Sequence, residues 1–470
     1  MEEKSKTIER KPMAGDMTQG KILKPLLFFA LPMLFGNVFQ QLYNTVDSIV
    51  VGQYVGGEAL AAVGTSFPVL HMLVALFMGI AMGSGVIVSQ YFGAKDFVQL
   101  KKAVRTSITL TLIVGFGSSV LGLFLAKPML HLLNTPANVF DMAYEYVMII
   151  FLATPASLLY NIISGILRGL GDSKWPLFFL IVASVINIVL DLLFVAVFRW
   201  GIAGAAWATL IAQFCAAVFS FIKLQHREEY VRLKRGDLRI DRDIVKHLIR
   251  LGLPSGLQDT AFSVGMIVIQ SFTNTFGYAV MAAGNAVMRV DGFAVMPMGS
   301  ISMATTTFIG QNVGAGKLDR VKKGARTAML LIIGIGGTLS ALVVIFGPAL
   351  MRLFTSDPRV LEVGGVALRI LGPFYWLLGL SFLLGGILRG AGDALFPAII
   401  SLTTMILVRI PLAYFLAVKT GDYRGLYFSM ISGFTIGAVA NFLRFISGKW
   451  RGKAVTRGPI ATEEAAASES

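Results

Sequence analysis

Two aspartates lie inside long apolar stretches of the N-terminal half of the sequence, and these stretches contain no basic residue that could neutralise them. Asp47 and Asp191 lie among hydrophobic residues, and no Lys or Arg occurs at the same depth in this half. An unpaired charge in an apolar medium costs roughly 3 kcal/mol or more. The chemistry expected of these two carboxyl groups is therefore exchange of a proton or binding of a small cation.

The first apolar stretch carries Asp47 at the end of a polar stripe. The spacing i, i+3, i+4, i+7 places four side chains on one face of an α-helix: Gln40, Tyr43, Asn44 and Asp47. A polar face on an otherwise apolar helix is expected to line a cavity or to contact another helix. We expect Gln40, Tyr43 and Asn44, together with Asn161, to line a substrate cavity. A ladder of hydrogen bonds that only packs helices together is the alternative.

Asp191 has polar neighbours of its own. Asn187 precedes it by about one helical turn, so the amide and the carboxylate share a face, and Thr209 in the next apolar stretch can add a hydroxyl oxygen. Oxygen ligands suit a hard cation. The sequence thus predicts one cation site, at which Asp47, Asn187, Asp191 and Thr209 bind a proton or Na⁺. A polar knot that only joins three helices is the alternative.

The C-terminal half contains apolar stretches with charges of both signs. Asp259 and Asp291 occur there with Arg289 and Arg409. Opposite charges can cancel inside the protein, so we expect these four side chains to form buried ion pairs that fix the packing. A cation site is therefore expected in the N-terminal half only.

The elements that must position these residues are membrane helices. The chain has 470 residues, of which 55% are hydrophobic and 14% charged, and its mean hydropathy is +0.73. A soluble protein of this length needs more charge to cover its surface. Twelve apolar segments reach the roughly 20 residues that a crossing requires. We predict an all-α membrane protein with twelve transmembrane helices in two six-helix bundles.

The basic residues fall mainly in alternate gaps between these segments. This is the positive-inside pattern, so the net charge of +15 does not indicate nucleic acid. We expect the cell (inner) membrane, with both termini cytoplasmic. The richest gap divides the chain, and the predicted layout is a tail (1–24), a bundle (25–223), a linker (224–247), a second bundle (248–447) and a second tail (448–470).

The two bundles repeat one pattern. The run Ile166–Asp172 returns as Ile387–Asp393, and Gln90 returns as Gln311, in both cases 221 positions later. Six crossings per copy give both copies the same orientation, related by a pseudo-two-fold axis along the membrane normal. Two such bundles suit alternating access, whereas a channel is more often a ring of subunits.

Each copy of the repeated run contains an arginine and an aspartate four residues apart. Arg168 stands with Asp172, and Arg389 with Asp393, beside glycines at the expected helix ends. We expect these pairs to end the helices and to latch an inner gate, without binding substrate.

These motifs resemble the multidrug and toxic compound extrusion (MATE) family, and most of all its DinF-like bacterial branch. The similarity covers residues 21–449 and rests on Leu31-Pro32, the run Gln40–Asp47, the two ILRG-x-GD copies and the run Asn187–Asp191. The resemblance implies that Asp47, Asn187, Asp191 and Thr209 couple a cation to transport. It also implies a hinge at Pro32 in the first helix, for which a static kink is the alternative.

The function expected from the resemblance is secondary active multidrug efflux. Cationic, amphipathic organic molecules would leave in exchange for inward H⁺ or Na⁺, through a monomer that needs no cofactor. No Walker A sequence is present, so ATP is not expected to drive transport, and no enzyme activity is expected. The alternative is a flippase for a lipid-linked saccharide, although the unpaired charges of the N-terminal half are acidic and favour cationic cargo.

Overall fold

The computed structural model describes residues 15–132, 135–226, 231–233 and 236–456, with the backbone alone along 65–76. Over these ranges the chain is helical, and no β-strand occurs in them. The predicted fold class, two bundles of membrane helices, is confirmed. By length and composition, ten of the described helices could cross a membrane; α2 adds a shorter apolar stretch, Phe77–Gly93, and α7 begins with a charged turn.

The N-terminal bundle contains α1 (Leu23–Tyr54), α2 (Gly57–Gly93), α3 (Phe97–Leu132), α4 (Ala137–Gly169), α5 (Lys174–Asp191) with its π-helical continuation η1 (Leu192–Val197), and α6 (Gly201–Gln225). The C-terminal bundle contains α7 (Arg242–Asn274), α8 (Tyr278–Gly314), α9 (Leu318–Arg352), α10 (Pro358–Leu371), η2 (Gly372–Phe374), α11 (Tyr375–Gly390), α12 (Leu395–Thr403), η3 (Thr404–Arg409), α13 (Ile410–Ala413), η4 (Tyr414–Val418) and α14 (Arg424–Ile446). A short 3₁₀ turn, η5 (Arg451–Lys453), follows α14.

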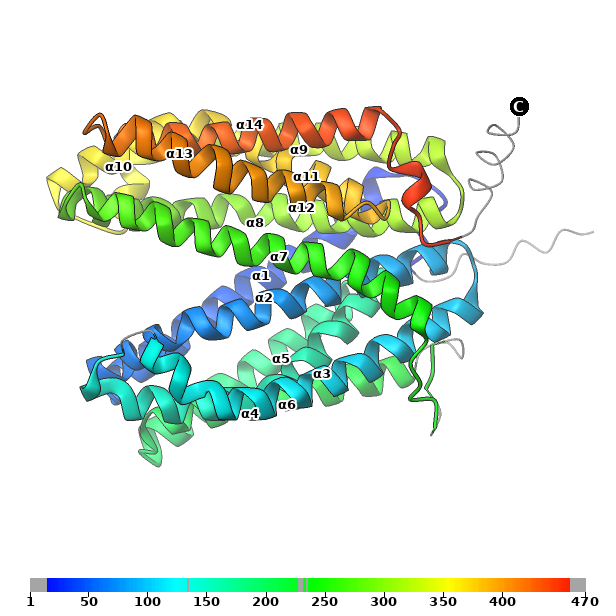
Figure 1. Ribbon diagram of the computed structural model, residues 1–470, viewed down its shortest axis with the longest axis horizontal. Helices are drawn as coiled ribbons and strands as arrows, with labels where there is room; N and C mark the ends of the chain where they lie inside the picture. The colour runs from blue at the N-terminus through cyan, green and yellow to red at the C-terminus, as the bar shows by residue number, and fades with distance from the viewer. Residues whose placement is uncertain (1–14, 133–134, 227–230, 234–235, 457–470) are drawn as a thin grey trace, which may run out of the picture.

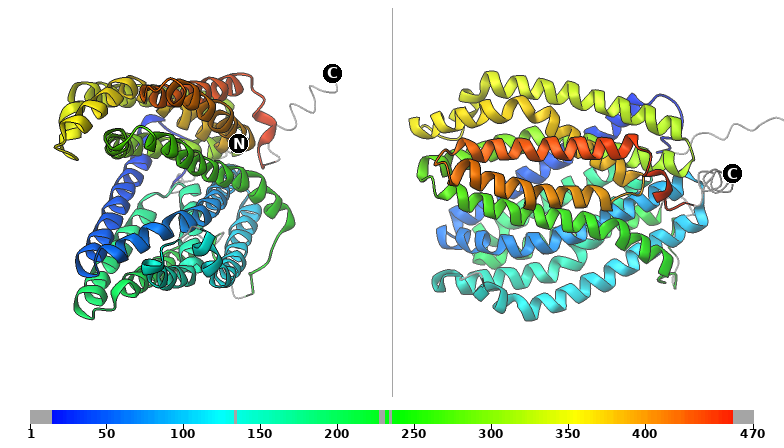
Figure 2. Two further views of the ribbon diagram at one scale, coloured as in Figure 1. Left: turned by 60° about the vertical axis from the view of Figure 1, so that its left-hand side comes forward. Right: turned by 45° about the horizontal axis from the view of Figure 1, so that its top comes forward.

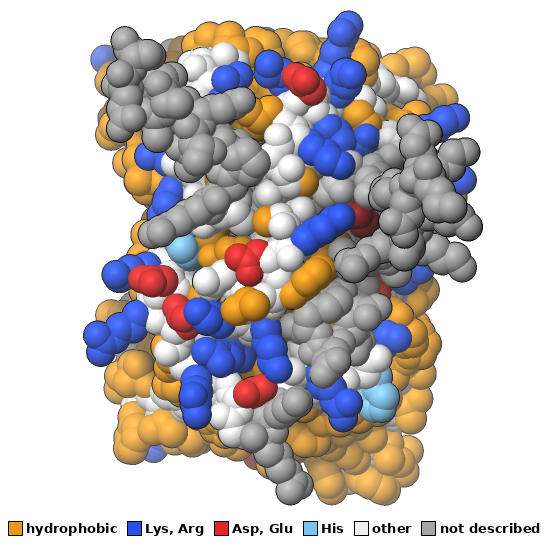
Figure 3. Space-filling model, turned by 90° about the vertical axis from the view of Figure 1, so that its right-hand side faces the viewer, with side chains coloured by type: hydrophobic (Ala, Val, Ile, Leu, Met, Phe, Trp, Pro, Cys, Tyr) orange, Lys and Arg blue, Asp and Glu red, His pale blue; other side chains and the backbone are white. Residues whose placement is uncertain are grey.

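The two bundles meet at one end of the molecule and diverge toward the other (Figures 1 and 2). At the meeting end α2, α4, α8 and α11 finish, and the face there displays many Lys and Arg side chains (Figure 3). We call this the basic end and the opposite one the far end. Because the bundles approach each other only toward the basic end, this conformation is closed on that side.

Two helices cross from one bundle to the other. The first turns of α1 bury Leu26 and Phe29 in the apolar cluster of the C-terminal bundle, whereas Val50 and Val51 near its far end belong to the N-terminal bundle. The helix α7 mirrors this arrangement, because its first turns pack on α2 and its last turns on η3, α13 and η4. Each bundle is therefore completed by the start of a helix that belongs to the other.

Candidate functional site

Three helices of the N-terminal bundle position the predicted cation group. Asp47 lies on α1, about two turns before its far end. Asp191 is the last residue of α5, where the backbone widens into the π-helical turn η1, and Asn187 lies one turn earlier. Thr209 comes from α6, which packs closely on α5 and η1. The predicted set from α1, α5 and α6 is thus brought to one place.

The side chains of this group are linked by hydrogen bonds. The carboxyl groups of Asp47 and Asp191 lie within hydrogen-bonding reach of each other, and a hydrogen bond between them requires a proton on one of the two. Because a carboxylate oxygen can only accept, the Asn187 amide turns its nitrogen to Asp191 Oδ2 and donates to it over 2.9 Å. Its oxygen then accepts from the Thr209 backbone nitrogen over 3.3 Å, so Asn187 ties α5 to α6.

One oxygen of each carboxyl group is left over. Asp47 Oδ1 and Asp191 Oδ1 are buried and have no hydrogen-bond partner among the described residues. None of the ion pairs formed by the described chain involves either residue. Buried polar atoms rarely stay unpartnered, so the two Oδ1 atoms are candidates to bind a proton or a cation. Orphaned carboxylate oxygens next to an amide and a hydroxyl are a donor set that fits a hard cation such as Na⁺.

Two tyrosines surround the carboxyl pair. The hydroxyls of Tyr43 and Thr209 share a hydrogen bond, which ties the polar stripe of α1 to α6. Tyr146 on α4 is 8% exposed and lies close enough to Tyr43, Asp47 and Asp191 to interact with their charges. Sequence reasoning missed Tyr146, because its only signal was a polar tip on an apolar segment and nothing paired it with α1.

The residues predicted to line a substrate cavity separate into two groups. Gln40 and Asn44 are exposed on α1, on the polar stripe that ends at Asp47. Tyr43 lies beside the carboxyl pair of Asp47 and Asp191 instead. Asn161 lies on α4, about four turns nearer the basic end than Tyr146. Its amide donates to the Ser157 carbonyl of its own helix over 2.9 Å, so the structure does not bring Asn161 to the carboxyl pair.

Pro32 lies in the first third of α1, within a helix that continues unbroken from Leu23 to Tyr54. A proline has no backbone N–H, so the carbonyl one turn earlier, that of Phe28, loses its helical donor. The turn around Pro32 is therefore weaker than its neighbours. It separates the part of α1 that packs on the C-terminal bundle from the part that carries Asp47.

The charged residues of the C-terminal bundle are arranged differently from the prediction. Asp291 accepts a hydrogen bond from the Tyr375 hydroxyl and attracts Arg409, which is 5% exposed. The closest polar contacts of the Arg409 guanidinium are thioethers, Met405 Sδ at 3.6 Å and Met266 Sδ at 3.7 Å. The attraction between Asp291 and Arg409 is one of the buried pairs that the sequence predicted.

Arg289 was wrongly predicted to be buried. It is exposed, and its guanidinium lies over the Phe354 ring at 6.0 Å, because α8 turns this position outward near the far end. Asp259 interacts with Arg389 on α11, a residue that the sequence had assigned to another pair.

The repeated runs lie at helix ends, as expected, but the predicted pair of Arg389 with Asp393 is wrong. Asp393 pairs with Arg444 of α14 at 2.8 Å and not with Arg389. Asp172 accepts from the backbone of Lys174 over 3.2 Å and so caps α5. Spacing along a helix could not reveal these partners, because each long arginine side chain reaches across to a neighbouring helix.

The repeat gives the carboxyl pair no equivalent in the C-terminal bundle. The offset between Pro32 and Pro254 aligns Asp47 with Ile269 in the second bundle. The offset between the two ILRG runs aligns Asp191 with Leu412. Ile269 is 6% exposed and packs in an apolar cluster with Ala413 and Ala417. In the described chain no group of three or more His, Cys, Asp or Glu side chains could hold a metal ion. The two bundles are alike in fold and unlike in chemistry.

Two repeated helical bundles that diverge from a closed end, with a carboxyl pair in one of them, define a multi-pass membrane transporter. The MatE family profile matches residues 32–193 and again 254–415. The chain is 31% identical over 446 residues to the probable multidrug resistance protein YoeA of Bacillus subtilis (strain 168), covering 93% of this chain and 96% of that one. It is 32% identical over 441 residues to the probable multidrug resistance protein YpnP of the same organism, covering 93% and 98%.

A solved structure described as "Crystal structure of MATE in the bent conformation" has a similar fold. It superimposes with a TM-score of 0.88 at 26% identity, over 95% of this chain and 100% of that one. This chain belongs to the MATE family of multidrug efflux transporters. Members of the family are transporters and not enzymes, as the sequence predicted, and they work on small molecules without a cofactor.

Proposed function

We propose that this transporter exports cationic, amphipathic organic molecules in exchange for H⁺ or Na⁺ moving inward. The observation that carries the proposal is the close pair of Asp47 and Asp191, whose buried Oδ1 atoms have no partner in the described chain. Two carboxylates in contact repel each other unless a proton or a cation lies between them. Filling and emptying this pair is the event that changes the conformation.

The coupling group consists of Asp47, Asn187, Asp191 and Thr209. The two orphaned carboxylate oxygens and the Thr209 hydroxyl would hold Na⁺, while a proton would need only the carboxyl pair. Asn187 holds Asp191 in place through its amide nitrogen. Cargo and coupling ion then compete, because an organic cation near Asp47 replaces the charge that the ion supplied.

The moving parts are the two bundles and α1. The basic end faces the cytoplasm under the positive-inside rule, which puts both termini in the cytoplasm and the far end outside. Bending at Pro32 would let the Asp47 half of α1 respond to the carboxyl pair while its first turns stay packed on the C-terminal bundle. The exposed Gln40 and Asn44 lie on the same stripe and would contact cargo. Asn161, on α4, is proposed as a further cargo contact, and a single chain as the working unit.

The relatives named above do not support the alternative of a lipid-linked saccharide flippase. Their names refer to multidrug resistance, which agrees with an acidic site and cationic cargo. A drug exporter is therefore the function that the carboxyl pair supports best.

The test is transport by the wild-type protein in inside-out membrane vesicles. Uptake of a fluorescent organic cation is measured with a Na⁺ gradient alone, with a pH gradient alone and with neither. We expect one of the gradients to drive uptake at least several-fold above the level without a gradient. Equal uptake under all three conditions would contradict ion coupling. A lipid-linked saccharide accepted in place of the organic cation would contradict the cargo.

We expect Tyr146→Phe to weaken the response to the coupling ion by roughly twofold to tenfold, since one polar contact is worth about 0.5–1.5 kcal/mol. The measurement is the ion concentration that gives half-maximal uptake. Tyr144→Phe is the matched control, because the Tyr144 ring packs under Lys127 at 4.9 Å, away from the carboxyl pair. Equal effects of the two variants would exclude Tyr146 from the coupling group.

A further inference from the structure

Both ends of the described chain lie across the junction of the two bundles at the basic end. We call Gly15–Gly20 the N-terminal strap and Trp450–Thr456 the C-terminal strap. Met17 of the first is buried in the apolar cluster of the C-terminal bundle, and Val455 of the second in that of the N-terminal bundle. Neither segment was singled out by the sequence, yet each anchors buried side chains in a helical core: Met17 and Thr18 in the first, and Trp450 and Val455 in the second.

Gln311 of α8 holds the N-terminal strap. Its side-chain oxygen accepts from the Met17 backbone nitrogen over 2.8 Å, and its amide nitrogen donates to the carbonyls of Gly15 (3.2 Å) and Gly169 (3.1 Å). Gly169 is the last residue of α4, so one side chain joins the strap and both bundles. Gly15 and Gly171 are in backbone contact, because a Cβ on Gly171 would lie 2.0 Å from the Gly15 carbonyl oxygen.

Gln90 of α2 holds the C-terminal strap in the same way. Its oxygen accepts from the Val455 backbone nitrogen over 2.7 Å, and its amide nitrogen donates over 2.9 Å to the carbonyl of Gly390, the last residue of α11. The strap also touches Gly392, where a Cβ would lie 2.3 Å from the Lys453 carbonyl oxygen. The Gln311 bonds to Met17 and Gly169 thus have counterparts in the Gln90 bonds to Val455 and Gly390, whereas the Gln311 bond to Gly15 has none.

The spacing along the chain shows that this correspondence is part of the repeat. Gln311 follows Gln90 by 221 positions, as Gly390 follows Gly169. The ends of α2 and α8, which carry the two glutamines, are also in backbone contact. A Cβ on Gly93 would lie 1.9 Å from the carbonyl oxygen of Gln311, and a Cβ on Gly314 would lie 1.9 Å from the carbonyl oxygen of Gln90. The two straps belong to opposite ends of the sequence and lie outside the repeat, yet they occupy equivalent positions.

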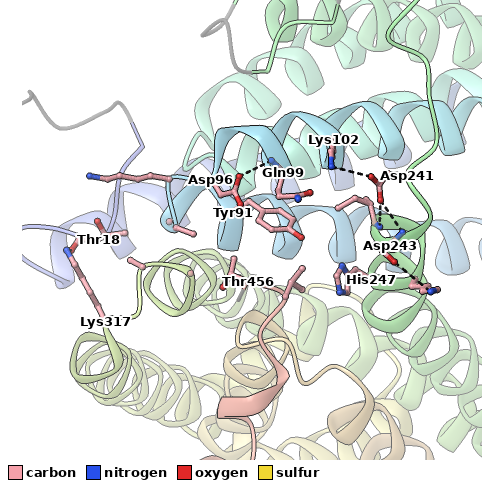
Figure 4. Close-up of a pocket in the computed structure, with 18 of the residues that line it drawn as sticks. Thr18, Tyr91, Asp96, Gln99, Lys102, Asp241, Asp243, His247, Lys317 and Thr456 are labelled. Carbon is pink, nitrogen blue, oxygen red and sulfur yellow. Dashed lines mark hydrogen bonds and ion pairs between the residues drawn. The ribbon is translucent and has the colours of Figure 1, made fainter. Parts of the chain in front are cut away.

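The straps also border a cavity of about 970 Å³ that opens on the basic end (Figure 4). Thr18 and Gln19 line it from the N-terminal strap, and Val455 and Thr456 from the C-terminal strap. Below the straps, α2 and α8 are in backbone contact, so the cavity ends there. Solvent on the basic side is therefore stopped by the straps and by the two helix ends that they hold together.

We propose that the two straps are latches that keep the basic end closed, and that each is released when this end opens. In the closed conformation Gln90 and Gln311 each bind one strap and one carbonyl of the opposite bundle. Rocking the bundles apart separates the glutamine from that carbonyl, and the strap hydrogen bond must break or move with it. Weakening either latch should shift the population toward a state open at the basic end.

The experiment measures access to the junction and does not measure drug transport, so its result is independent of the proposed function. In a background with Cys215→Ala, the reporter Thr307→Cys is placed on α8 in the small cavity between the bundles, where Thr307 is 6% exposed. A membrane-impermeant maleimide is added to inside-out vesicles and to intact cells. The reporter Val98→Cys, at a position 70% exposed, identifies the preparation in which the basic end is accessible.

Val455→Pro is the decisive variant, because it deletes the N–H that donates to Gln90 and leaves the helices intact. Ala454 has φ −55° and ψ 149°, a conformation that suits the residue before a proline. We expect labelling of the reporter from the basic end to become roughly threefold to tenfold faster. Val455→Ala keeps the N–H and is the matched control, for which we expect less than twofold change. Gln90→Leu and Gln311→Leu should act like Val455→Pro, and Gln99→Ala, which lines the same cavity, should not.

Thermal unfolding of each variant is recorded, so that a change in labelling is interpreted only for protein that is folded. Unchanged labelling in folded Val455→Pro would overturn the proposal, as would equal acceleration by Val455→Ala and Val455→Pro. If the glutamine variants fail to fold, the two Val455 variants decide the question alone.

Discussion

Replacing Asp47 by Asn is expected to abolish drug efflux while the protein still folds and reaches the membrane. The substitution keeps the size of the side chain and removes the charge that must be neutralised by a proton or cation. Asp191 would then keep its hydrogen bond from Asn187 but lose the carboxyl group with which it shares the ion. We expect a loss of at least about a hundredfold in ion-driven transport, because a coupling group that cannot change its charge cannot use the gradient.

The measurement for Asp47→Asn is efflux of a fluorescent organic cation together with the melting temperature of the purified protein. The melting temperature should stay the same or rise, since an unpaired carboxylate in an apolar setting costs stability. Asp141→Asn is the matched control, because Asp141 is an exposed carboxylate of the same bundle, near the far end of α4. Full drug resistance in cells that express Asp47→Asn would disprove the role assigned to the carboxyl pair.

Replacing Asp291 by Asn is expected to have the reverse effect, lowering stability and sparing ion coupling. Arg409 is 5% exposed, and its guanidinium has two thioether contacts besides its attraction to Asp291. Removing the carboxylate leaves a buried positive charge uncompensated, which costs about 3–5 kcal/mol. The free energy of unfolding or the melting temperature should fall accordingly, and the hydrogen bond from Tyr375 is weakened as well.

The matched control for Asp291→Asn is Arg289→Gln two residues earlier on α8. Arg289 is exposed, so its loss should change stability by no more than about 0.5 kcal/mol. The protein that folds is then assayed for Na⁺-driven and pH-driven transport. Normal stability with lost ion dependence in Asp291→Asn would place a coupling site in the C-terminal bundle and contradict the functional inequality of the two bundles.

The fold was predictable because apolar length and repetition are properties of the chain itself. Twelve stretches of membrane length and one spacing of 221 positions define two similar bundles without any knowledge of contacts. The prediction of the cation group rested on periodicity and on the family resemblance. Gln40 to Asp47 and Asn187 to Asp191 each share a helical face, and a carboxylate without a basic neighbour is visible in the sequence.

Contacts between helices were not predictable to the same degree. Tyr146 approaches Asp47 only because α4 and α1 both pack on α2 and α6, and nothing in its local sequence indicates that arrangement. The partners of Arg389 and Asp393 were misassigned because a long side chain reaches other helices as easily as its own turn. The packing of the straps was not predicted, because polar chain ends have no periodic pattern. The repeated pair of Gln90 and Gln311 was visible in the sequence, but their partners were not.

The crossing of α1 and α7 has a consequence for biogenesis. The first turns of α1 are synthesised early, but Leu26 and Phe29 bury themselves against helices that leave the ribosome in the second half of translation. Until α8 and α9 arrive, this part of α1 has only lipid or chaperones to cover it. The N-terminal half made alone would leave that apolar surface without its natural cover, and the half from α7 onward would lack the turns of α1. The duplicated halves are therefore no longer separable units, and the last stage of assembly must be the joint docking of both.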